Sequence, residues 1–123
     1  MHSTPLPDAS PHQQDLDRLH AQLAAMIERA LALPANQLTL PFRELVATVE
    51  ADFRSEEQLM DSFECPEHLL HREQHARMQA GLHHAAAALE QGDPLPARQA
   101  MAALREWLPF HIATQDRHLL RAP

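Results

Sequence analysis

The sequence predicts an all-α protein folded as an up-down-up-down antiparallel four-helix bundle. The 123 residues contain only two glycines, are rich in Ala and Leu, and include few aromatic residues, a composition that favours helix over sheet. Apolar residues recur at three- and four-residue spacing in four separate segments. Short, proline-marked connections separate these segments, and short connections place neighbouring helices antiparallel.

Prolines and a glycine give the boundaries of the four predicted helices. Residues 1–11 carry three prolines and no apolar periodicity, so they predict a flexible arm ahead of a bundle over residues 12–123. The helices are expected to run from about Ser10 to Leu33, Thr39 to Phe63, Pro66 to Gln91 and Pro96 to Leu120. Pro11 and Pro66 suit first helical positions, and Gly92 suits the position just after a helix end.

Composition excludes several classes of function. The net charge of −7 disfavours binding to nucleic acid or to an anionic membrane surface. A single cysteine, Cys65, rules out an internal disulfide and fits a reducing compartment. We find no signal-peptide pattern at the N-terminus and no apolar stretch of membrane-spanning length. The sequence therefore predicts a cytoplasmic protein.

The inward faces of the predicted helices are interrupted by His, Asp and Glu. Each helix has an apolar stripe, and each stripe contains residues that can bind a metal. These residues are His20 in the first helix, Asp52 and Glu56 in the second, His71 and His75 in the third, and His111 in the fourth, with Asp116 beside that line. In an antiparallel bundle, these positions can lie near one another, toward one end of the core.

Burying carboxylates in an apolar core costs several kcal/mol for each unpaired charge. A network of His–carboxylate pairs is one way to offset this cost, and rotation of the helices toward water is another. A metal centre explains the whole set better, because rotating the second helix outward would also expose its apolar residues. Mixed imidazole and carboxylate ligands suit iron, manganese or zinc, and several carboxylates that can bridge suit a pair of irons.

Four motifs around these residues occur in a fixed order. They are "DLDRLHAQL" with His20, "DFRSEEQLM" with Asp52 and Glu56, "PEHLLHREQH" with His71 and His75, and "WLPFHIATQD" with His111 and Asp116. Together they resemble the hemerythrin family, specifically the single-domain bacterial hemerythrins, over about residues 15–120. The second motif resembles the family pattern HFxxEExLM, and the fourth resembles WLxxHIxxxD.

This resemblance implies a non-haem di-iron site. His71, His75 and His111 would hold one iron, and Glu56 and Asp116 would bridge it, together with an oxo or hydroxo group, to the other. His20 would hold the second iron, which in the family keeps an open position for reversible O₂ binding. Asp52 stands where the family has a His, and we expect it to bind this second iron.

The change to Asp52 leaves more than one function open. The first interpretation is a protein that binds O₂ for carriage, storage or sensing without catalysis. An anionic oxygen ligand favours ferric iron, so the alternative is a di-iron oxidase or peroxidase, or an iron-handling protein, that holds no stable O₂. A third is a metal-stabilised or metal-sensing bundle acting through a partner. O₂ or peroxide is the expected small-molecule ligand, with a reductant or protein partner that the sequence does not identify.

Two residues near the predicted ligands have alternative interpretations. Glu57 points about 100° away from Glu56 on a helix, so it is either solvated or accepts a hydrogen bond from a ligand. Trp107 is expected to pack in the core and to exclude water from the site.

Overall fold

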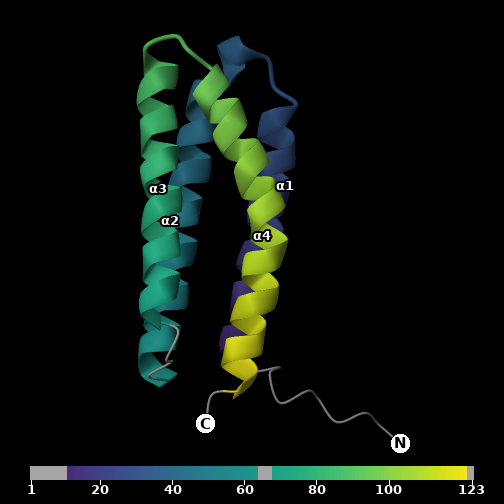
Figure 1. Ribbon diagram of the computed structural model, residues 1–123. Coiled ribbons are helices and arrows are strands. Elements are labelled where there is room, and N and C mark those ends of the chain that lie inside the picture. Colours follow the sequence, from purple (N-terminus) through teal and green to yellow (C-terminus); the bar gives the residue numbers. More distant parts are fainter. Residues whose placement is uncertain (1–10, 64–67, 122–123) are drawn as a thin grey trace, which may run out of the picture.

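Four helices make up most of the chain in the computed structural model, which describes residues 11–63 and 68–121 (Figure 1). They are α1 (Pro11–Leu31), α2 (Thr39–Phe63), α3 (His68–Glu90) and α4 (Leu95–Arg121), with a short 3-10 helix, η1 (Ala35–Gln37), before α2. No strand occurs within these described ranges, so the all-α prediction is confirmed there. The predicted flexible arm and the predicted helix start at Pro66 lie outside the described residues.

The helices lie side by side as a bundle (Figure 1). α2 and α4 each pack against both α1 and α3. The predicted helical bundle is therefore present, with one interior shared by all four helices. Within the part of the chain that the structure describes, no helix combines the length and the apolar character needed to cross a membrane.

Local chemistry fixes the helix ends at one end of the bundle. Gly92 has a φ of 88°, and the amides of Gly92 and Asp93 donate to the carbonyls of Leu89 and Ala88 at 3.0 and 2.9 Å. This is a Schellman motif, and it confirms the predicted role of Gly92. The Asp93 carboxylate then accepts the amide of Leu95 at 3.2 Å where α4 begins.

The buried interior changes character along the bundle. An apolar core occupies the end near the α3–α4 connection, and it contains the largest buried aliphatic and aromatic side chains. Its members include Leu23, Ile27, Leu38, Phe42, Leu45, Leu82, Met101 and Leu104. Toward the other end, the same helix faces continue with buried polar residues. The apolar core supplies the burial that holds the helices together while the polar end is free to serve another purpose.

Candidate metal centre

Six of the seven predicted metal ligands are buried side chains. Their exposed fractions are 3% for His20, 0% for Asp52, 0% for Glu56, 2% for His71, 0% for His75 and 3% for His111. The seventh, Asp116, lies in a part of α4 whose side chains are outside the described residues. The prediction that these polar residues face the interior is therefore confirmed for all six that the structure describes.

Glu56 lies at the centre of the cluster, and its two carboxylate oxygens face different neighbours. Nε2 of His20 lies 2.8 Å from Oε2. On the other oxygen, Nε2 of His111 lies 2.5 Å from Oε1 and Nε2 of His75 lies 3.2 Å from it. The cluster therefore divides into two groups of donor atoms with one carboxylate between them.

The first group consists of His20 and Asp52. Oδ2 of Asp52 lies 3.4 Å from Nε2 of His20. Among the described residues, none donates a hydrogen bond to either oxygen of Asp52, although its side chain is fully buried. A buried carboxylate without hydrogen bonds is costly, and His20, at 3.4 Å, offsets the charge of this one only when its ring is protonated.

The second group consists of three His from α3 and α4. Nε2 of His75 and Nε2 of His111 are 3.4 Å apart, so both nitrogens converge on Oε1 of Glu56. The His71 ring lies beside them, with its centroid 6.3 Å from that of His75 and 5.7 Å from that of His111. The i, i+4 spacing of His71 and His75 places both on the same face of α3.

Aromatic residues fix the rings of the second group. The Phe53 ring stacks on His75 with centroids 3.8 Å apart and an interplanar angle of 7°, and Trp107 stacks on His111 at 4.2 Å and 17°. Trp107 was expected near the site, but Phe53 was not. The missed signal is a second stripe on α2 at seven-residue spacing, formed by the buried residues Val46, Phe53 and Met60.

Glu57 lies beside a predicted ligand, His75, and is not fully exposed to solvent. Nδ1 of His75 lies 2.8 Å from Oε2 of Glu57, within hydrogen-bonding distance, and the Glu57 side chain remains 24% exposed. Nε of Arg72 lies 3.8 Å from the other oxygen of Glu57, and Arg72 also pairs with Asp61 at 3.1 Å. A chain of polar contacts thus runs from the surface to the back of the His75 ring.

The electrostatics of the cluster differ between its two carboxylates. Burial and then the negative charge of Glu56 raise the pKa of Asp52, against an opposing effect of His20, and the net change is from 3.8 to about 7. Burial also acts to raise the pKa of Glu56, but hydrogen bonds from His111, His20 and His75 outweigh it, so this pKa lies well below 4.5. Burial acts to lower the pKa of His75, and its hydrogen bonds to Glu56 and Glu57 raise it above 6.5 instead.

The spacing of the donor atoms suits a metal ion. Two ligands on adjacent corners of an octahedron, each about 2.1 Å from the metal, lie about 3 Å apart. The separations in the cluster run from 2.5 Å between His111 and Glu56 to 3.4 Å between His75 and His111. Ligand atoms of His20, Glu56 and His111 all lie within 4.8 Å of one another. A cation here would also compensate the buried charge of Asp52, so the residues fit a metal.

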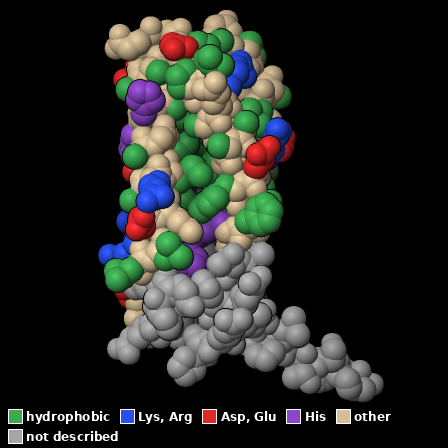
Figure 2. Space-filling view, in the orientation of Figure 1, with side chains coloured by type: hydrophobic (Ala, Val, Ile, Leu, Met, Phe, Trp, Pro, Cys, Tyr) green, Lys and Arg blue, Asp and Glu red, His purple; other side chains and the backbone are tan. Residues whose placement is uncertain are grey.

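An apolar pocket lies between α3 and α4 beside this cluster. Its volume is about 340 Å³, and Met78, Gly81, Leu82 and Trp107 are among its lining residues. Figure 2 shows hydrophobic side chains along the seam between these two helices, with His side chains at its lower end. Since Trp107 both lines this pocket and stacks on His111, the pocket adjoins the second donor group.

Comparisons of the chain with models of protein families, with curated proteins and with solved structures found no match. The class of site therefore follows from the residues themselves. It is a buried His and carboxylate cluster, inside a helical bundle, that could hold a metal. The resemblance to hemerythrins stays a prediction.

Proposed function

We propose that this protein is a hemerythrin-like non-haem di-iron protein that binds O₂ for carriage, storage or sensing. The proposal includes the up-down-up-down order of the helices, two iron ions in each chain, and Asp116 as a second bridging carboxylate. The short connections and the pairwise packing of the helices support the predicted order. The six buried polar side chains support the metal centre.

One observation carries the proposal of two ions rather than one. The two oxygens of Glu56 face two separate donor groups, with His20 at 2.8 Å from Oε2 and His111 at 2.5 Å from Oε1. A carboxylate that bridges two metal ions presents its oxygens in this way. A single ion between His20, Glu56 and His111, whose ligand atoms lie within 4.8 Å of one another, would draw on both groups, so the amount of iron per chain decides between one ion and two.

In this proposal each donor group holds one iron. His71, His75 and His111 would hold one ion, His20 and Asp52 would hold the other, and Glu56 and Asp116 would be shared between them. The pair of irons would supply reversible binding of O₂. The ion held by His20 and Asp52 would have fewer protein ligands than the other, which would leave room there for a small ligand.

The surrounding side chains support this function by shape and polarity. Phe53 and Trp107 hold the His75 and His111 rings in place and cover the second donor group with apolar surface. Asp52 and Glu56 are fully buried, so bulk water is excluded from the cluster. A dry apolar surrounding suits a ligand such as O₂, which carries no charge and gains little from water.

A second candidate function is favoured by one residue. Asp52 places an anionic oxygen donor where the family pattern has an imidazole, and such a donor favours ferric over ferrous iron. The corresponding protein is an oxidase or peroxidase, or an iron-handling protein, in which O₂ oxidises the site instead of leaving unchanged.

The experiment that separates these functions starts from protein reconstituted with ferrous iron under anaerobic conditions. The optical spectrum is recorded as O₂ is admitted and then removed. The proposed O₂ binder gives an absorption band that appears with O₂ and disappears on its removal. Irreversible conversion to a stable ferric spectrum rejects reversible O₂ binding, and peroxide turnover then establishes the second candidate.

A further inference from the structure

The two ring nitrogens of His75 face two different carboxylates, and one of these, Glu57, is not among the proposed metal ligands. Nδ1 of His75 faces Oε2 of Glu57 at 2.8 Å, while Nε2 faces Oε1 of Glu56 at 3.2 Å. A neutral imidazole has only one N–H, so two carboxylates compete for one proton. A metal ion needs the lone pair of Nε2, which is available only if the proton lies on Nδ1.

We propose that Glu57 is a positioning residue that holds neutral His75 in the Nδ1–H tautomer and so presents the Nε2 lone pair to the metal centre. This inference rests on the proposed function, because it assigns to His75 the role of a metal ligand. It adds a residue outside the predicted ligand set, and it gives a different role to each of the two adjacent acids on α2. Glu56 faces the centre, and Glu57 acts from behind the ring.

The geometry favours Glu57 over Glu56 in this competition. Its oxygen is closer to the ring nitrogen, at 2.8 Å against 3.2 Å. Glu56 also accepts contacts from His20 and His111, so its charge is shared among several donors. Among the described residues, Glu57 faces a single His ring, and Nε of Arg72 lies 3.8 Å from its other oxygen.

The orientation of the His75 ring does not depend on Glu57 alone. Phe53 stacks on the ring at 3.8 Å and nearly parallel to it, and the ring is fully buried. Removal of the Glu57 carboxylate therefore leaves the ring in place, and only the site of its proton changes. With Glu56 as the remaining carboxylate beside the ring, the proton moves to Nε2 and blocks the metal.

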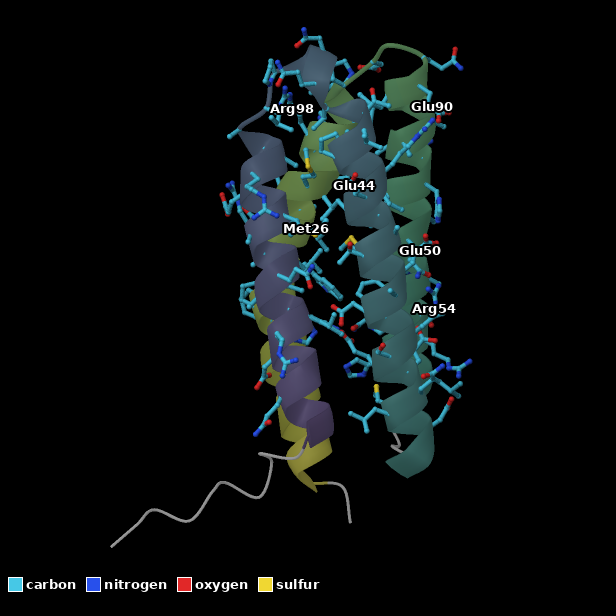
Figure 3. All side chains as sticks on the ribbon, turned by 180° about the vertical axis from the view of Figure 1, so that it is seen from behind. Met26, Glu44, Glu50, Arg54, Glu90 and Arg98 are labelled. Carbon is cyan, nitrogen blue, oxygen red and sulfur yellow. The ribbon has the colours of Figure 1, made fainter. Side chains whose placement is uncertain are left out.

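The chain provides a matched control for this hydrogen bond. Glu50 also lies on α2, and its Oε2 is 2.9 Å from Nε2 of His83 on α3. Figure 3 shows Glu50 on the side of α2 next to α3, where its side chain is 32% exposed. Glu50→Ala thus removes a His–carboxylate contact between the same two helices, at 2.9 Å against 2.8 Å, without touching the cluster.

The test compares Glu57→Ala, Glu57→Gln and Glu50→Ala with the unaltered chain in two measurements. The first is the tautomer of His75, read from its ring ¹⁵N chemical shifts in metal-free protein at pH 9. The second is the affinity for Fe(II), measured anaerobically against a competing chelator. We expect Glu57→Ala to move the proton to Nε2 and to weaken Fe(II) binding by about 10- to 100-fold. Glu57→Gln, whose side-chain carbonyl still accepts the Nδ1–H, should recover most of this loss, and Glu50→Ala should change neither quantity.

Two results would overturn the inference. One is an unchanged His75 tautomer in Glu57→Ala, whatever happens to the affinity. The other is a tautomer change with no loss of Fe(II) affinity, because the tautomer would then not matter for the metal. If the unaltered chain bound no iron, the proposed function would fall, while the ¹⁵N shifts would still decide whether Glu57 sets the tautomer.

Discussion

The buried carboxyl of Asp52 makes the stability of the metal-free protein depend on pH. A carboxyl group with a pKa of 3.8 in the unfolded chain and about 7 in the folded chain binds its proton more tightly when folded. Between these two values the folded chain holds more protons than the unfolded chain, so the free energy of unfolding falls as pH rises. The contribution of Asp52 to the free energy of unfolding is fully present below pH 3.8 and is lost as pH rises through 7, and the whole change in this contribution is about 4 kcal/mol.

The assay is urea unfolding of metal-free protein at pH 5 and at pH 8, for the unaltered chain and for Asp52→Asn. Roughly 2–3 kcal/mol of the Asp52 contribution is lost between these two pH values. Asn has nearly the same size as Asp and does not titrate in this range. Between pH 5 and pH 8, the free energy of unfolding of Asp52→Asn should therefore fall by roughly 2–3 kcal/mol less than that of the unaltered chain. The stabilising contribution of His75 is also lost as pH rises through its raised pKa, but this loss is common to both proteins. The contribution of Glu56, whose pKa is lowered, is lost only as pH falls below 4.5, outside the interval.

Glu50→Gln serves as the control, because it alters an acid on the same helix that contacts an exposed His. This variant should keep the pH dependence of the unaltered chain. Equal losses of stability between pH 5 and pH 8 in Asp52→Asn and the unaltered chain would refute the reasoning. Asp52 would then not be held as a buried, uncompensated carboxylate in the metal-free protein.

Three further predictions concern the site and the fold. Asp52→His should lengthen the lifetime of the O₂-bound form, followed by decay of its absorption band, and an unchanged or shorter lifetime would contradict the role given to Asp52. Met101→Ala should cost about 2–5 kcal/mol in urea unfolding, since Met101 is fully buried in the apolar core; a loss under 1 kcal/mol would show that the core closes around the gap. Gly92→Ala should cost about 1 kcal/mol in thermal unfolding, because φ is 88° there and nothing lies within 4 Å of an added Cβ; unchanged stability would contradict the Schellman motif.

The helices could be predicted well because local residues define their ends. Gly92 supplies the positive φ that ends α3, and Pro11 begins α1 as expected. The first helix ends at Leu31 instead of near Leu33, and η1 follows it. A three-residue 3-10 helix is too short to produce an apolar period, so the sequence carried no signal for it.

The sequence was enough to predict that the side chains of the candidate site point into the bundle interior. Acids on an apolar stripe are costly enough to require an explanation, and Asp52 and Glu56 are both fully buried. Phe53 was missed because a single line at three- and four-residue spacing underestimates how wide the buried face of α2 is. α2 packs against both α1 and α3, so two adjacent stripes are covered.

The role of Glu57 could not be decided from the sequence. Its hydrogen bond to His75 joins residues 18 positions apart on different helices. The choice between solvent and His75 depends on how far α3 is rotated and shifted along α2, which no local pattern encodes. The division of the cluster by the two oxygens of Glu56 is a three-dimensional feature for the same reason.

The number of iron ions bound per chain tests the central claim most directly. Protein reconstituted anaerobically with excess Fe(II), and then freed of unbound metal, is analysed for iron and for protein concentration. The proposed centre, with one donor group on each oxygen of Glu56, predicts two irons per chain. One iron would mean that only one donor group binds metal, and none would mean that the cluster is a metal-free polar network; either result would contradict the di-iron proposal.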